Sequence, residues 1–376
     1  MKRCSTYQAT LSEGRAAGWA HGLADSACQE ARKLLLRQAR KRFGPEGDSK
    51  HSILDAASDL AFLETLAPKL LDAGSWQEWL AGVRVPPPSP RAEPDYMRYY
   101  EFDPTKEQLG VDSFIEVKDL RGNRAVIHIR MQSQYEPDVG KTIWKENEKV
   151  HRQQDLPVSS VVILLHEGAD GPNVTGEYAP IPRPGQKPGD TFRYTVARAW
   201  EKTPGELLAG GLGILPLAPM SNLTEAELPG VIQRMGEIIG KQAKPEDAAK
   251  LWLSTYFFMG LRYPTDLVKN LLADFMPLIR STENYQGVLA KGYVQGVSQG
   301  MVEGPIRAAK SLVRTQGEKR FGPPDAASAG ALDAANDLEH LERLAERLLD
   351  AGSWPELLAV ERTTACTAAD SRAPSD

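Results

Sequence analysis

The chain contains one segment twice, and this repeat constrains its fold more than any other feature of the sequence. Residues 7–80 align with residues 285–358 at a constant offset of 278 without a gap, and 33 of the 74 positions are identical. A repeat of this kind is one structural unit that buries its apolar face against a neighbour. We therefore expect the two copies to share one fold. They can pack on each other, on the central part of the chain, or on a second molecule.

Each copy has the pattern of an all-α helical hairpin followed by a short terminal segment. In the second copy, six apolar residues recur every three or four positions, as they do along an amphipathic helix. They are Leu332, Ala335, Leu338, Leu341, Ala345 and Leu348. Gly-Pro pairs at 44–45 and 322–323 end a first helix rich in lysine and arginine. The Ala-Gly-Ser-Trp segments predict a left-handed cap at Gly74 and Gly352, where the second helix ends.

The first helix carries two patterns with more than one explanation. Gly14, Gly18 and Gly22 are spaced like a contact motif of membrane helices, but in water each glycine weakens a helix by up to about 1 kcal/mol. We interpret them as a hinge or a helix of low stability. Residues 31–42 hold six lysines or arginines and no acid, so contact with phosphate is one explanation. The second copy replaces several of these cations, for example by Glu318, which favours a solvated helix face.

Length and composition indicate a multidomain globular protein of the cytoplasm. The 376 residues exceed one usual domain, and no run of about 18 apolar residues predicts a membrane span. Three scattered cysteines fit neither a disulfide framework nor a zinc site. A net charge of −5 argues against a protein built to coat nucleic acid. The expected organisation is repeat copy 1 (7–82), a proline-rich linker (83–95), an α/β core (96–201), a helical extension (202–284), repeat copy 2 (285–360) and a disordered tail (361–376).

The central part of the chain predicts strands followed by helices. Alternating apolar residues at 114–117 and 125–132 flank a Gly-Asn turn, as in a β-hairpin. A helix-permissive segment at 140–154 precedes the apolar run 159–165, which is typical of a buried strand, and residues 192–200 predict one more strand. Residues 223–241, 245–261 and 264–279 predict helices, and the aromatic residues at 252–263 are interpreted as core. The fold class is α/β with a helical C-terminal half.

Several motifs carry a resemblance to a known family. They are VDSFIEV (111–117), VIHIRMQS (126–133), LPVSSVVILLHEGADGPNVTG (156–176), LLAGGLGILPLAP (207–219), MGLRYP (259–264), KRFGPPDAA (319–327) and LERLAERLLDAGSW (341–354). The central segment resembles the recombination-promoting nuclease and transposase-associated branch of the PD-(D/E)XK nuclease superfamily. The repeated tail is similar to a helical domain of unknown function that is often attached to that branch.

The resemblance implies a Mg²⁺-dependent DNA endonuclease linked to recombination or mobile elements. An Asp on one strand and a Glu-x-Gln on the next would hold the metal, which activates a water. Carried over, the metal-binding and catalytic Asp is Asp112 and the catalytic Gln is Gln132, but Arg130 stands at the position of the Glu. Replacing a carboxylate by a guanidinium changes the charge beside the metal position by two units, and each product of unit charges at about 4 Å is worth about 4 kcal/mol at an effective dielectric near 20. Even after a large discount for solvent, a loss of about 4 kcal/mol would weaken Mg²⁺ binding roughly a thousandfold.

Other departures point the same way. Glu116 shares a strand face with Asp112 but lies about 13 Å along the strand, so it cannot replace the missing ligand. The family's Tyr-Asn pair corresponds here to Glu146 and Asn147, and the first repeat with its linker takes the place of the family's first strand and helix. We expect an N-terminally truncated, degenerate nuclease, descended from a tandem duplication with a deletion. In it, a structural ion pair between Arg130 and Asp112 is favoured over a role of Arg130 as a clamp on the substrate.

The alternative is a non-catalytic interaction protein that acts through the duplicated hairpins. Self-association through the repeats would then be its function, and the α/β core would only support them. A further hypothesis is that the two hairpins pair within one chain and imitate a dimer contact. DNA is the partner that the resemblance implies, although the acidic composition counts against tight binding.

Overall fold

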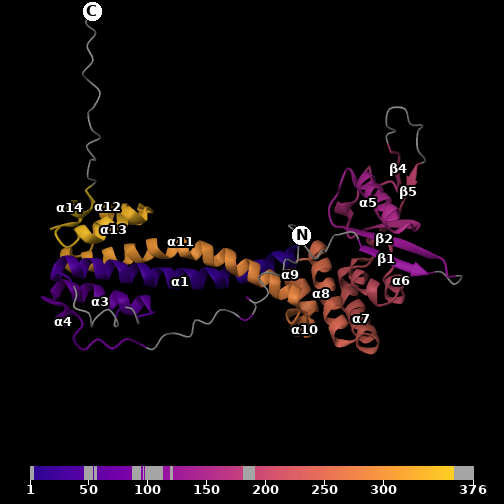
Figure 1. Cartoon of the computed structure of the whole chain (residues 1–376). Helices are drawn as coiled ribbons and strands as arrows, with labels where there is room; N and C mark the ends of the chain where they lie inside the picture. Colours follow the sequence, from indigo (N-terminus) through magenta and orange to yellow (C-terminus); the bar gives the residue numbers. More distant parts are fainter. Residues whose placement is uncertain are drawn as a thin grey trace, which may run out of the picture. The chain divides into compact units, whose positions relative to one another are not determined.

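The chain is mostly helical and contains a small mixed sheet of four strands (Figure 1). The computed structural model describes residues 4–45, 54, 57–86, 95, 97, 113–118, 122–180 and 191–359. The chain divides into two compact units: the first comprises residues 1–15 and 94–293, and the second residues 16–93 and 294–376. The prediction of helices together with an α/β sheet is confirmed. Most of the predicted linker and the predicted tail lie outside the described residues.

The sheet of the first unit has the strand order β1-β2-β3-β6. Its strands are β1 (Ser113–Lys118), β2 (Arg124–Gln132), β3 (Val158–Leu164) and β6 (Thr195–Arg198). β1 and β2 form the predicted antiparallel hairpin, with Ser113 opposite Ile129. Gly122 in their turn has a φ of +85°, which glycine adopts without steric cost. Helix α5 (Val139–Gln154) then connects β2 to β3, and β2, β3 and β6 are parallel.

Helical elements cover both faces of this sheet. On one face, Val162 and Leu164 of β3 pack against Ile143 of α5. On the other face, Met131 and Ile163 pack against a larger core built by the helices that follow the sheet. The sheet is thus a middle layer. Alternate residues of β2 and β3 therefore face two different cores, as the pleat of a strand requires.

Five α-helices lie entirely within the first unit after the sheet. They are α6 (Pro204–Ala209), α7 (Leu228–Gln242), α8 (Pro245–Arg262), α9 (Thr265–Leu271) and α10 (Met276–Arg280). The predicted aromatic core is confirmed, because Trp252, Tyr256 and the neighbouring aromatic residues of α8 are buried. The single helix predicted at 264–279 is wrong. It is two helices, and Pro277 lies in the first turn of the second, where its missing N–H costs no hydrogen bond.

The single strand predicted at 192–200 is also wrong. Phe192–Arg193 form β5, which pairs with β4 (Glu177–Tyr178) in a separate two-stranded sheet. Tyr194 lies between β5 and β6, and its amide donates to the carbonyl of Gly176 at 2.8 Å. This hydrogen bond holds Tyr194 next to Gly176, just before β4. Only the residues after Tyr194 therefore pair with β3 in the main sheet.

The second unit contains both copies of the repeat around one shared core. Copy 1 contributes residues 16–43 of α1 (Ser5–Phe43), together with α3 (Leu60–Asp72) and α4 (Trp76–Trp79). Copy 2 contributes residues 294–321 of α11 (Glu283–Phe321), with α12 (Ala326–Ala334), α13 (Leu338–Arg347) and α14 (Trp354–Leu358). Apolar residues of both copies form a single cluster. Both repeats are helical, as predicted, and they pack on each other within one chain. The single second helix predicted from the stripe at 332–348 is wrong, because α12 and α13 are separated at residues 335–337.

One prediction about glycines in the repeats is wrong. Gly74 and Gly352 are not left-handed, and the equivalent glycines with a positive φ are Gly44 and Gly322, at +79° and +80°. The glycines of the first helix, predicted as a hinge or a helix of low stability, lie in α1, which is helical over all of its 39 residues. A Cβ on Gly22 would lie 2.4 Å from the carbonyl oxygen of Val297 in α11. The glycine therefore permits close contact between two helices.

Candidate functional site

Polar side chains gather where the parallel strands of the first unit end. Ligands of α/β sheets bind at the carboxyl ends of the strands, so this edge is the place to look for a site. Gln132 ends β2, His166 follows β3, and Arg198 ends β6. Each of them is held by a specific contact, and together they define the candidate site.

Arg130 is held in an ion pair two residues before the end of β2. Its Nη2 lies 2.8 Å from Oε2 of Glu136, and its side chain is 13% exposed whereas that of Glu136 is 45% exposed. Glu136 lies in the segment that leads into α5. Its carboxylate compensates the partly buried guanidinium. The expected pair between Arg130 and Asp112 stays a prediction, because Asp112 lies outside the described residues.

Gln132 is almost completely buried on the same face of β2. The side chain is 3% exposed, and Nε2 donates to the carbonyl oxygen of Ala169 at 3.4 Å. Its Oε1 is buried and accepts no hydrogen bond from the described residues. A buried acceptor without a donor is costly, so its presence calls for an explanation, and a catalytic role is one of them. Among the predicted site residues that the structure describes, Gln132 thus has an oxygen atom, Oε1, that could still act as a ligand.

A buried chain of hydrogen bonds links the sheet to α5 beside this site. Nδ2 of Asn147 donates to Oγ of Ser160 and to the carbonyl oxygen of Val158, both at 2.9 Å. Oγ of Ser160 lies 3.1 Å from Nδ1 of His128, which is fully buried. Asn147 therefore anchors α5 on β3. Its neighbour Glu146 instead points to the surface and pairs with Lys149 at 3.4 Å.

The sequence did not single out His166, Asp170 and Arg198. Nδ1 of His166 accepts from the amide of Gly168 at 3.1 Å, so Nε2 carries the proton and donates to the carbonyl oxygen of Ser133 at 2.8 Å. Arg198 holds Asp170 with two hydrogen bonds of 2.7 and 3.2 Å, which lower the pKa of that carboxyl. His166 and Asp170 lie in the segment that follows the apolar strand β3, and Arg198 is the last residue of β6. Their position at strand ends was the available signal.

Glu116, the other acidic residue considered for the site, pairs with Arg124 instead. Glu116 accepts two hydrogen bonds from Arg124, at 2.6 and 2.8 Å, at the opposite end of β2 from Gln132. These hydrogen bonds lower the pKa of Glu116. The structure thus brings Arg130 and Gln132 together on one strand face and keeps Glu116 apart from them.

The described residues of the site do not fit a divalent cation. Mg²⁺ prefers carboxylate and carbonyl oxygens, and Gln132 offers one free oxygen. Arg130, two residues away on the same face, brings a positive charge toward the same place. Among the described residues there is no group of three or more His, Cys, Asp or Glu side chains that could hold a metal ion. The arrangement is that of ion pairs and hydrogen bonds that fasten loops to strand ends.

Comparison with known proteins identifies no relative: no family model, curated protein or solved structure matches the chain. Within the part of the chain that the structure describes, no helix is long and apolar enough to cross a membrane.

Proposed function

We propose that the first unit derives from a metal-dependent DNA endonuclease of the PD-(D/E)XK type and that the present chain does not cleave DNA efficiently. The observation that carries this proposal is Arg130, which takes the place of a metal-binding Glu and is held there by Glu136 at 2.8 Å. A cation with its own carboxylate partner leaves the position unsuited to Mg²⁺.

The arrangement of the strands supports the proposed ancestry. The motif residues end β2, β1 pairs antiparallel with β2, and α5 follows and packs on the sheet. This is the order that the resemblance implies, with an Asp on one strand, the second motif on the next and a helix behind them. The buried Gln132, whose Oε1 accepts no hydrogen bond from the described residues, fits a residue that once served a site.

Restoring the carboxylate tests the proposal. The natural protein and Arg130→Glu are incubated with supercoiled plasmid in Mg²⁺ and in Mn²⁺, and nicking is followed on gels. We expect the natural protein to leave the plasmid intact and Arg130→Glu to nick it, because two carboxylates can then hold the metal. Arg130→Glu/Gln132→Leu should lose the gained activity.

The matched control is Arg152→Glu. It makes the same change of charge on α5, where the Arg152 side chain is 77% exposed, and it should not cut. Efficient cleavage by the natural protein would show that another carboxylate supplies the metal. A folded Arg130→Glu protein that stays inactive in both metals would instead contradict the assigned site.

The second candidate function is an interaction protein that acts through the helical repeats. The shared core of the two copies favours it, since each hairpin buries its apolar stripe on the other. The contacts between the copies define this candidate further.

A further inference from the structure

At the centre of the second unit, polar contacts made by one copy of the repeat have equivalent contacts made by the other copy. Gln38 and Gln316 occupy the same position in the two copies, and each amide donates to the other's Oε1 at 2.8 Å. Both side chains are buried, 1% and 0% exposed. Gln38 also donates to the carbonyl of Ala345, and Gln316 to the equivalent carbonyl of Ala67. A contact that recurs when the copies are exchanged marks a two-fold axis.

The long helices approach each other in the same symmetric way. A Cβ added to Gly22 would lie 2.4 Å from the carbonyl oxygen of Val297. A Cβ added to Gly300 would lie 2.5 Å from the carbonyl oxygen of Trp19. The two contacts are equivalent, because Gly300 lies 278 residues after Gly22 and Val297 lies 278 residues after Trp19. Glycine at both positions lets the backbones touch where side chains would hold them apart.

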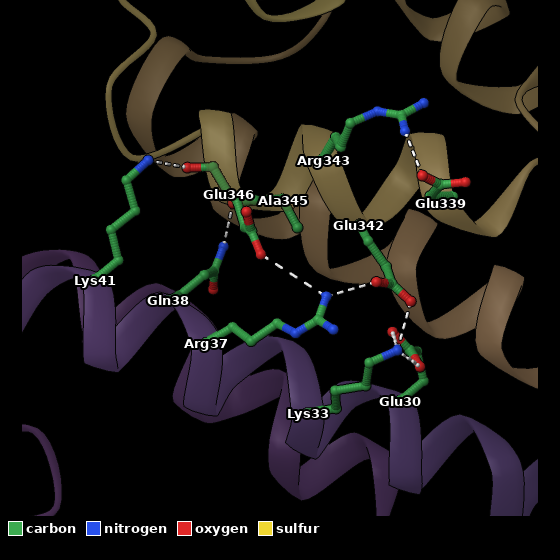
Figure 2. A network of polar contacts seen from close by, with 10 residues as sticks. All are labelled: Glu30, Lys33, Arg37, Gln38, Lys41, Glu339, Glu342, Arg343, Ala345 and Glu346. Carbon is green, nitrogen blue, oxygen red and sulfur yellow. Dashed lines mark hydrogen bonds and ion pairs between the residues drawn. The ribbon is translucent and has the colours of Figure 1, made fainter. Parts of the chain in front are cut away.

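The polar contacts near the ends of the long helices follow the same rule. Nζ of Lys41 lies 2.6 Å from the carboxylate of Asp350 and 2.9 Å from the carbonyl of Glu346. In the other direction, Lys319 pairs with Asp72 and donates to the carbonyl of Pro68 at 2.9 Å. Figure 2 shows Lys41 with Glu346, together with other polar side chains of α1 that reach across to α13.

Such an interface is what two identical surfaces form when they bury each other. Two linked copies could also pack head to tail, but then equivalent residues would have different partners. Here Gln38 meets Gln316, its own equivalent, and both copies contribute to one apolar core. A buried pair that must meet in register also selects one alignment of the helices, because any shift leaves amide groups without partners.

We propose that the repeat is a self-recognition module and that this chain carries both halves of its dimer. The surface around Gln38 in one copy, and around Gln316 in the other, binds the same surface of another copy of this repeat. Within the chain the two copies satisfy each other. The partner that fits either surface is therefore a second copy of the repeat, on this chain or on another.

The outer contacts predict how strong each pairing is. Lys33 and Arg37 of copy 1 face Glu342 of copy 2 at 2.5 and 2.6 Å. In the other direction, Ser311 takes the place of Lys33 and donates to Glu64. A pair of two second copies would therefore set Ser311 against Glu342 on both sides and lose these ion pairs. We expect pairing between two second copies to be weaker than pairing between unlike copies.

A nicked full-length chain tests this inference. A protease site replaces residues 87–90, and the chain is cut only after it has folded, so that copy 1 and the remainder stay together without a covalent link. Nicked protein grown in heavy and in normal isotopes is mixed at about 50 µM in mild urea, and native mass spectrometry follows the complexes. We expect mixed-label complexes of copy 1 with the remainder, and a minority of complexes that contain two remainders.

Every outcome decides the inference. Complexes with two remainders support self-recognition by copy 2. Mixed-label complexes without any such pair would mean that each copy recognises only the other one, and they overturn it. If no label exchanges after a day, the two fragments are separated in stronger urea and reassociated by dilution, and reassociation without any complex of two remainders likewise overturns it. The readout is a mass, so it is independent of nuclease activity and of the proposal made for the first unit.

Substitutions at the axis distinguish this surface from other contacts of the copy 1 fragment, such as the hydrogen bond of the Cys4 thiol to Phe257 in the first unit. Gln38→Glu and Gln316→Glu should each speed exchange at least about tenfold, because each removes the amide donors and buries a charge. The two effects should agree within about threefold, since the sites are equivalent. Gln29→Glu, the same change at an exposed position of α1, should leave the exchange rate unchanged. Unequal effects at positions 38 and 316 would contradict the two-fold arrangement.

Discussion

The two copies of the repeat match at the centre of their interface, but they bury one equivalent tryptophan to different depths. In copy 2 the indole of Trp354 is 5% exposed, and it packs so closely on Gly317 that a Cβ there would lie 2.2 Å from its ring. In copy 1, Ala39 takes the place of Gly317, and Trp76, the equivalent of Trp354, is only partly buried. Both indoles keep the same hydrogen bond, to the carbonyl oxygens of Gly322 and Gly44.

The difference shows which substitutions a buried interface tolerates. One methyl group at position 39 accompanies an indole that is less deeply buried, and copy 1 fills its core with Trp79 where copy 2 has Leu357. Buried volume is therefore redistributed between neighbouring positions rather than lost, as dense packing requires. At the axis, by contrast, Gln38 and Gln316 are identical, because neither amide could change without leaving the other unpaired.

Removing each indole gives the largest expected effect. Trp354→Ala should lower the free energy of unfolding by about 3–5 kcal/mol, because it empties a buried site. Trp76→Ala should cost less, about 1–3 kcal/mol, because its ring is only partly buried. Urea unfolding followed by circular dichroism measures both. Equal losses would mean that the depth of the ring does not distinguish the copies.

Exchanging the small residues beneath the rings should have a smaller effect. Gly317→Ala gains helix propensity of about 1 kcal/mol but forces Trp354 outward, so we expect a net loss of about 1–3 kcal/mol. Ala39→Gly should lose about 1–2 kcal/mol, from one buried methyl group and from the weaker helix. In a Trp354→Ala background, Gly317→Ala should become stabilising. If the substitution stays destabilising there, the ring is not what the glycine accommodates.

Local patterns in the sequence predicted the elements better than their partners. The alternation at 125–132 correctly places Arg130 and Gln132 on one strand face. The periodicity at 332–348 predicts one helix, but the structure breaks it at residues 335–337 into α12 and α13. The role of the glycines could not be predicted in this way, because spacing alone is the same in a weak helix and in a helix that touches another. The carbonyl oxygen of Val297 near Gly22 decides between them, and it lies more than 270 residues away.

The same limit applies to the candidate site. A residue's strand face follows from its position, but the partners of Arg130 and Gln132, which are Glu136 and Ala169, depend on how loops return to the sheet. Residues 192–200 likewise look like one strand, since the alternation continues through Tyr194. Which sheet each half joins depends on Gly176, to which Tyr194 donates.

The smallest expected effect comes from the ion pairs around the axis, and it depends on pH. Burial opposes ionisation of Glu342, whose side chain is 15% exposed, but hydrogen bonds from Lys33 and Arg37 outweigh burial and lower the pKa of its carboxyl. A carboxyl with a lowered pKa in the folded state stabilises it above the unfolded pKa of about 4.3. This contribution is lost as the pH falls through the lower folded value.

Glu342→Gln should therefore destabilise the protein by about 1 kcal/mol at pH 7, and the difference from the natural protein should shrink toward zero near pH 3. Urea unfolding at several pH values measures it. Glu339→Gln is the control, because Glu339 is 80% exposed and pairs with Arg343 on its own helix, so it should change stability little at any pH. A Glu342→Gln loss that is the same at pH 3 and pH 7 would show that shape, rather than charge, matters at this position. Since Ser311 stands where copy 1 has Lys33, the matching substitution Glu64→Gln should cost less than Glu342→Gln at pH 7, and this would extend the difference between the copies from the core to the rim.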